Sequence, residues 1–119
     1  MLLTFGSPLD KVAFLFTLQG EKTSAAREAL AGSVQPLIAD PAKRRFPWIN
    51  VWAPTDIFSG RLDYYDLPEE AGEQAEAAGA LRVDNRKDDE ATTLLLAHSE
   101  YWENPLIFRV LHAGLTGAG

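Results

Sequence analysis

The sequence contains no cysteine, and this absence excludes disulfide bonds, thiolate catalysis and cysteine-ligated zinc. The lack of cysteine also fits a reducing compartment, so we expect a cytoplasmic protein. A run of about 18 apolar residues is missing as well, and the sequence therefore predicts no membrane span. Met1–Phe5 has no basic region of the kind that starts a secretory signal.

Positive charge is scarce. The 11 lysines and arginines are outnumbered by 17 acids, which gives a formal net charge of −6 and argues against binding to a nucleic-acid backbone. The basic cluster Lys43–Arg45 is short, and we expect it to form a solvated turn before a strand.

No cofactor is predicted from the remaining patterns. There is no glycine loop of the phosphate-binding type. The two histidines lie 14 residues apart without a cysteine, which does not make a zinc site. The acids Asp84 and Asp88–Glu90 lack the spacing of a calcium loop, so a solvated acidic turn is expected there.

What the sequence does contain is typical of one globular domain. Hydrophobic residues make up 46% of the 119 positions, and we treat residues 1–119 as a single unit. Three segments are predicted to be strands. The first is an apolar run and the second is rich in β-branched and aromatic residues. The third is predicted as a short strand. The three segments are Leu2–Phe5, Trp48–Trp52 and Leu81–Asn85.

Helices are expected between and after these strands. Ser7 and Pro8 predict an N-cap and first turn for a helix over Lys11–Gln19, with Val12, Phe14, Leu15, Phe16 and Leu18 mostly buried. Asn104 and Pro105 predict a last helix that runs to about Ala113 and is ended by Gly114, Gly117 and Gly119. A further helical stretch is expected at Ser24–Leu30, a solvated helix or loop at Glu69–Gly79, and a strand or helix entry at Thr92–Ala97.

Strands that alternate with helices favour an α/β fold with a partial, open parallel sheet of about three or four strands and flanking helices. Such a small sheet leaves at least one apolar edge uncovered. An uncovered edge predicts pairing with a partner or with a second copy of the chain.

Two residues are candidates for catalysis. Asp56 follows the strand Trp48–Trp52, at the place where open α/β sheets carry their sites. His98 lies 42 residues later and is a plausible loop base. The acid would orient the imidazole and stabilise the imidazolium. The alternative for Asp56 is an ordinary Asx turn, and His112 is expected to be a packing or solvent-edge histidine.

In four segments the chain resembles the C-terminal half of lipase- and esterase-like α/β-hydrolases, and the likeness covers nearly the whole chain. The segments, in order, are Phe5–Leu9, Trp48–Asp56, Val83–Asn85 and His98–Trp102. The resemblance implies that Asp56 is the triad acid, that His98 is the triad base, and that Tyr101 and Trp102 pack beneath or beside the histidine loop. A small ester would be the substrate.

The chain departs from that family in one motif. The nucleophile elbow Gly-x-Ser-x-Gly is absent, and no serine has the required glycines. Ser7 is better explained as a helix cap, and Ser99 adjoins His98. We therefore expect a segment that supplies acid and histidine but is inactive alone, with a missing N-terminal half. The alternative is a non-catalytic assembly module that self-associates through sheet edges.

Overall fold

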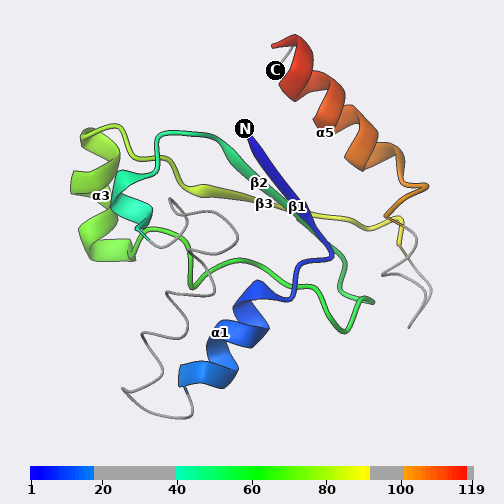
Figure 1. Ribbon diagram of the computed structural model, residues 1–119, viewed down its shortest axis with the longest axis horizontal. Coiled ribbons are helices and arrows are strands. Elements are labelled where there is room, and N and C mark those ends of the chain that lie inside the picture. Colours follow the sequence, from blue (N-terminus) through cyan, green and yellow to red (C-terminus); the bar gives the residue numbers. More distant parts are fainter. Residues whose placement is uncertain (18–39, 92–100, 118–119) are drawn as a thin grey trace.

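The computed structural model describes residues 1–17, 40–91 and 101–117, and Figure 1 shows their arrangement. The expected helical stretch at Ser24–Leu30 and the apolar stretch at Thr92–Ala97 lie outside this part. The described elements, in chain order, are β1 (Leu2–Phe5), α1 (Leu9–Thr17), the short 3-10 helix η3 (Pro41–Lys43), β2 (Trp48–Trp52), α3 (Glu69–Ala77), β3 (Val83–Lys87) and α5 (Pro105–Thr116). None of these helices has the length and apolar character needed to cross a bilayer.

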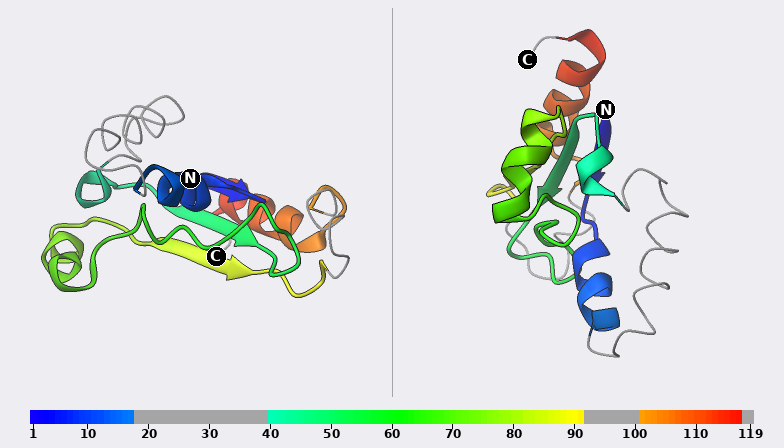
Figure 2. Two further views of the ribbon diagram at one scale, coloured as in Figure 1. Left: turned by 90° about the horizontal axis from the view of Figure 1, so that it is seen from below. Right: turned by 90° about the vertical axis from the view of Figure 1, so that its left-hand side faces the viewer.

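The three strands form one open parallel sheet in the order β1-β2-β3. They lie side by side in the left view of Figure 2, coloured blue, green and yellow. Leu2 pairs with Trp48, and Trp48 pairs with Val83. The expected α/β class is confirmed. β1 and β2 have the predicted bounds, whereas β3 begins two residues later than predicted.

The two faces of β2 pack against different helices, because alternate side chains of a strand point to opposite faces. One face carries Trp48, and its core cluster consists of Ala13, Trp48, Leu62, Tyr65 and Val83. The other face carries Val51, and its cluster consists of Val51, Ala53, Ala91, Tyr101 and Ile107. α1 therefore covers the first face and α5 covers the second (Figure 1).

Helix α1 starts at Leu9, two residues before the expected start. The Ser7 hydroxyl accepts a hydrogen bond from the Leu9 N–H at 3.4 Å, which confirms its capping role. Leu9 and Ala13, one turn apart, form the face that packs on the sheet. The expected burial of Phe14 is wrong: its side chain is 48% exposed, because it follows Ala13 by about 100° around the helix.

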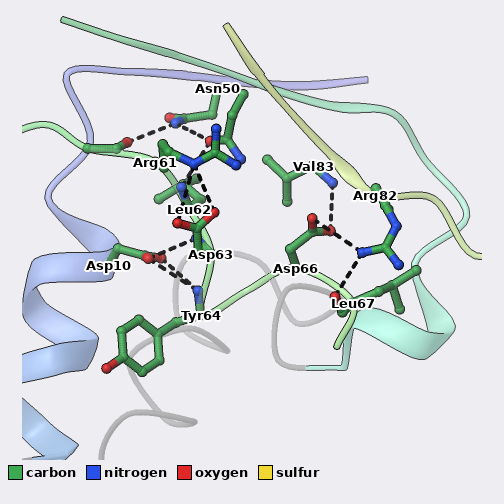
Figure 3. Close-up of polar contacts among 12 residues, drawn as sticks. Asp10, Asn50, Arg61, Leu62, Asp63, Tyr64, Asp66, Leu67, Arg82 and Val83 are labelled. Atoms are coloured by element: carbon green, nitrogen blue, oxygen red, sulfur yellow. Dashed lines mark hydrogen bonds and ion pairs between the residues drawn. The ribbon is translucent and has the colours of Figure 1, made fainter. Parts of the chain in front are cut away.

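A row of polar side chains crosses the sheet on the α1 face and fixes the strand register. The buried Asn50 of β2 accepts from Thr4 Oγ1 of β1 at 2.9 Å. Its amide nitrogen donates to Asn85 Oδ1 of β3 and to the carbonyl of Gly60, each at 2.9 Å (Figure 3). A one-residue slip of a strand would turn these groups to the other face.

The connection between β2 and α3 is tied to its surroundings by two carboxylates (Figure 3). Asp10 of α1 accepts from the backbone N–H groups of Asp63 and Tyr64, at 2.8 and 3.2 Å. Asp66 accepts from the backbone N–H of Val83 at 2.9 Å. The connection is therefore a fixed wall of the first core, although it contains no regular strand.

Arg44 corrects the expectation of a solvated basic turn, because its side chain is fully buried. Its guanidinium donates to the carbonyl oxygens of Leu81 at 2.8 Å and Tyr65 at 2.7 Å, and it pairs with Asp66 at 3.3 Å. It also stacks 5.3 Å from the Trp48 ring centroid. Burial lowers the pKa of Arg44, and the negative charge of Asp66 opposes that shift.

The end of β3 corrects the expectation of a solvated acidic turn in the same way. Asp88 is only 1% exposed; it accepts from the backbone N–H of Glu90 at 3.0 Å and from the amide nitrogen of Asn104. Asn104 in turn caps α5, since its Oδ1 accepts from the Leu106 N–H at 2.7 Å. α5 continues past Ala113 to Thr116, and Gly117, one of the glycines expected to end it, is its C-cap with a φ of 68°.

Candidate functional site

Asp56 lies in the turn that follows β2, at the carboxyl end of the sheet. Its backbone N–H donates to the Ala53 carbonyl at 3.1 Å, and its Oδ1 accepts from the Phe58 N–H at 2.9 Å. These bonds form the Asx turn expected as the alternative interpretation. The side chain is 3% exposed, so the turn holds a carboxylate in a fixed orientation inside the protein.

The Tyr101 hydroxyl reaches the same turn from the other end of the chain. It accepts from the backbone N–H of Ala53 at 3.0 Å and lies 3.0 Å from the Ser59 hydroxyl. Burial raises the pKa of Tyr101 to about 12; the Ser59 contact works against the rise, and the negative charge of Asp56 adds to it. We call Ala53, Asp56, Ser59 and Tyr101 the Tyr101 cluster.

A second contact joins the same turn to the end of the β3 connection. The Thr55 hydroxyl donates to the carbonyl oxygen of Ala91 at 2.5 Å. Ala91 and Tyr101 are the residues that border positions 92–100. Both borders are thus hydrogen-bonded to residues 53–59, the stretch that contains Asp56.

The expected base His98, with its neighbour Ser99, lies outside the described residues, and so its contact with Asp56 stays a prediction. His112 is described and lies on the exposed side of α5. The resemblance predicted that Tyr101 packs near the histidine loop. It did not indicate that the hydroxyls of Tyr101, Ser59 and Thr55 form hydrogen bonds around the turn of Asp56.

A cavity of about 600 Å³ opens beside the Tyr101 cluster, at the carboxyl end of β1. Among the described residues that line it, none is charged. The lining includes Phe5, Ser7, Phe58, Tyr101 and Trp102. Trp102 is 70% exposed, and its ring makes an edge contact with Phe5 at a centroid distance of 5.2 Å.

Within residues 1–17, 40–91 and 101–117, no group of three histidine or acidic side chains lies close enough to hold a metal ion. The Asp56 turn instead holds a carboxylate in a fixed orientation. Such a carboxylate can orient a partner base and stabilise its positively charged form. In comparisons with known proteins, no family model, no curated protein and no solved structure matches the chain.

Proposed function

We propose that this chain supplies the acid and the base of a serine-hydrolase-type site, with Asp56 as the acid and His98 as the base. The imidazole would take the proton of a serine hydroxyl as that hydroxyl attacks an ester carbonyl, and would return it to the leaving alcohol. Asp56 would hold the imidazole in one tautomer and stabilise its charged form.

The strand order supports this proposal. β2 and β3 are adjacent and parallel, so the segments that leave their carboxyl ends start at the same edge of the sheet. Asp56 follows β2 directly, and positions 92–100 come after β3. Open α/β sheets bind their ligands at this edge.

The hydrogen bonds of the two residues that border positions 92–100 are the main support for the proposal. Ala91 is hydrogen-bonded to Thr55, and Tyr101 is hydrogen-bonded to Ala53, so both border residues lie beside the turn of Asp56. Chain connectivity keeps the Cα of His98 within about 11 Å of the Cα of Tyr101, because three residues span no more than that. This limit is compatible with the proposed contact between His98 and Asp56.

We do not assign the nucleophilic serine to a residue of this chain. The sequence has no Gly-x-Ser-x-Gly, and Ser7 is engaged as the cap of α1. We propose that the serine comes from a polypeptide segment outside this sequence. The chain alone should then hydrolyse esters little or not at all.

An NMR titration of the imidazoles tests the acid–base pair without requiring activity. In a His112→Gln background, His98 gives the only histidine signal. The Asp56→Asn change should lower the pKa of His98 by about one unit, because a nearby carboxylate favours the imidazolium. Asp89→Asn, at an exposed acid, is the matched control. Equal titration of His98 with and without Asp56 would reject the pairing.

The open edge of β1 supports a second candidate, a module that assembles by strand addition. Leu2 donates to the carbonyl of Pro47, just before β2, and Gly6 donates to that of Val51 in β2. The alternation along the strand therefore turns the backbone groups of Leu3 and Phe5 to the other edge. No strand pairs with that edge in the described part of the chain. Such edges invite pairing with a second copy.

Sedimentation at several concentrations, combined with amide exchange, tests this candidate. If copies pair through β1, the amide protons of Leu3 and Phe5 become protected as the concentration rises, while those of Leu2 and Thr4 are protected throughout. A monomer over the whole range, with Leu3 and Phe5 exchanging fast, would exclude assembly at this edge.

A further inference from the structure

The cavity at the carboxyl end of β1 has a chemistry that differs from the rest of the molecule. The chain carries a net charge of −6, yet none of the described residues that line this cavity of about 600 Å³ is charged. A volume of this size falls within the range typical of small-molecule sites. The lining therefore suits an uncharged ligand, since burying an ionic group without a partner costs free energy.

Exposed aromatic surface points in the same direction. Trp102 is 70% exposed and Phe58 is 53% exposed, and both line the cavity. Each Å² of apolar surface that a ligand covers is worth about 25 cal/mol, so these two rings favour an apolar occupant. Phe5 holds the Trp102 ring in an edge contact, so one wall is preformed in the free protein.

One polar group completes the site. Ser7 lines the cavity, and its oxygen accepts from the Leu9 N–H. Its own O–H has no acceptor among the described residues, and can donate to a carbonyl oxygen of a ligand. Tyr101 also lines the cavity, but its hydroxyl already contacts Ala53 and Ser59.

We infer that this cavity binds an uncharged, mainly apolar small molecule that carries a carbonyl group. The inference deepens the proposed function, on which it rests for the meaning of the ligand as substrate, because Phe58 and Tyr101 join the cavity wall to the turn of Asp56. Binding itself requires neither His98 nor a nucleophile. It can therefore be tested apart from the acid–base pair.

Fluorine NMR of the 5-fluorotryptophan-labelled protein provides the test. The three tryptophans give three signals, assigned with Trp102→Phe and Trp52→Phe. We expect 2-octanone to shift the Trp102 signal in a saturable way and to leave the Trp48 signal unchanged. Octanoate, with the same chain length and a negative charge, should bind at least about tenfold more weakly, since the described part of the lining offers no cation.

Matched variants locate the ligand. Phe58→Ala removes part of the wall and should weaken binding of 2-octanone by about tenfold. Phe108→Ala is the control, because Phe108 is 56% exposed on α5 and does not line the cavity. Equal affinity of the two variants would overturn the inference.

Three further outcomes of the fluorine experiment would also overturn the inference. No saturable shift up to the solubility limit would mean that the cavity does not bind this class. A shift of Trp52 alone would place the ligand in the separate cavity beside α1, which Trp52 lines. A Trp102 shift that follows protein concentration without ligand would show that a second copy occupies the surface.

The two proposals can fail separately. If 2-octanone binds as expected but Asp56→Asn does not change the pKa of His98, the acid–base pair is rejected and the cavity assignment stands.

Discussion

The phenol oxygen of Tyr101 accepts a hydrogen bond from the backbone N–H of Ala53 at 3.0 Å, across 48 positions of the sequence. This bond attaches the segment that precedes α5 to the end of β2. Because Ser59 contacts the same oxygen, one hydroxyl satisfies two buried polar groups. The orientation of the Asp56 turn therefore depends on a residue that is remote in sequence.

Removing that hydroxyl should destabilise the protein. Tyr101→Phe leaves the Ala53 N–H and the Ser59 hydroxyl without this partner in a buried place, and should lower the free energy of unfolding by about 1–3 kcal/mol. Urea denaturation measures the change. Tyr64→Phe, at a side chain that is 46% exposed, should change it by less than about 0.5 kcal/mol. Equal losses in the two variants would contradict the role of the buried hydroxyl.

The same residue predicts a pH dependence in the alkaline range. Burial raises the pKa of Tyr101 from 10.0 to about 12 in the folded protein. Between these two values the unfolded chain loses the proton and the folded chain keeps it, so unfolding becomes easier as the pH rises. The contribution, about 3 kcal/mol, is present below pH 10 and is lost as the pH rises through about 12.

Denaturation of the wild type and of Tyr101→Phe between pH 9 and pH 12 isolates this effect, since the other alkaline titrations are common to both proteins. The stability of the wild type should fall more steeply, and the difference between the two should shrink. Parallel curves would show that Tyr101 titrates alike in the folded and unfolded states.

The sequence predicts the strands according to how much of each is buried. β2 packs on both faces, so its composition marks it clearly, and its bounds agree with the prediction. β3 was predicted two residues too early, because only Val83 is buried and the polar residues that follow resemble a connection. An edge strand needs few apolar side chains, so composition alone does not fix its end.

Burial of individual polar groups could not be predicted, because it depends on distant partners. Arg44 resembles a surface residue within its basic cluster, yet its guanidinium bonds to Leu81, 37 positions away. Asp88 is buried where Asn104, at the start of α5, donates a hydrogen bond to its carboxylate. The turn at Asp56 was predictable from local chemistry, whereas its link to Tyr101 was not.

Arg44 should be among the most sensitive positions to substitution. Arg44→Met removes the donor for the carbonyl groups of Leu81 and Tyr65 and the cation beside Asp66, and should cost about 3 kcal/mol of unfolding free energy. Thermal and urea denaturation measure it. Arg45→Met, at the exposed neighbour, is the control and should cost less than about 1 kcal/mol. A neutral Arg44→Met would mean that the buried guanidinium is dispensable.

Asn104 should report on the buried carboxylate of Asp88. Asn104→Asp keeps a capping oxygen for α5 but places a second negative charge against Asp88. Two adjacent carboxylates repel each other when both are charged, so the variant should lose about 2 kcal/mol of unfolding free energy at pH 7 and lose less at about pH 4. Asn104→Ser, an uncharged cap, should show no such pH dependence relative to wild type. A loss in Asn104→Asp that does not change with pH would argue against charge repulsion at this contact.

The absence of a nucleophile elbow predicts the response to a serine-directed probe. Incubation of the chain with a fluorophosphonate should leave its intact mass unchanged, because a serine without an elbow and an oxyanion hole is not activated. A stoichiometric adduct would contradict the proposal that the nucleophile lies outside this sequence. Its loss in Ser7→Ala or in Ser99→Ala would then identify the reactive residue. Retention of the adduct in Asp56→Asn would show that the reaction does not use the proposed acid.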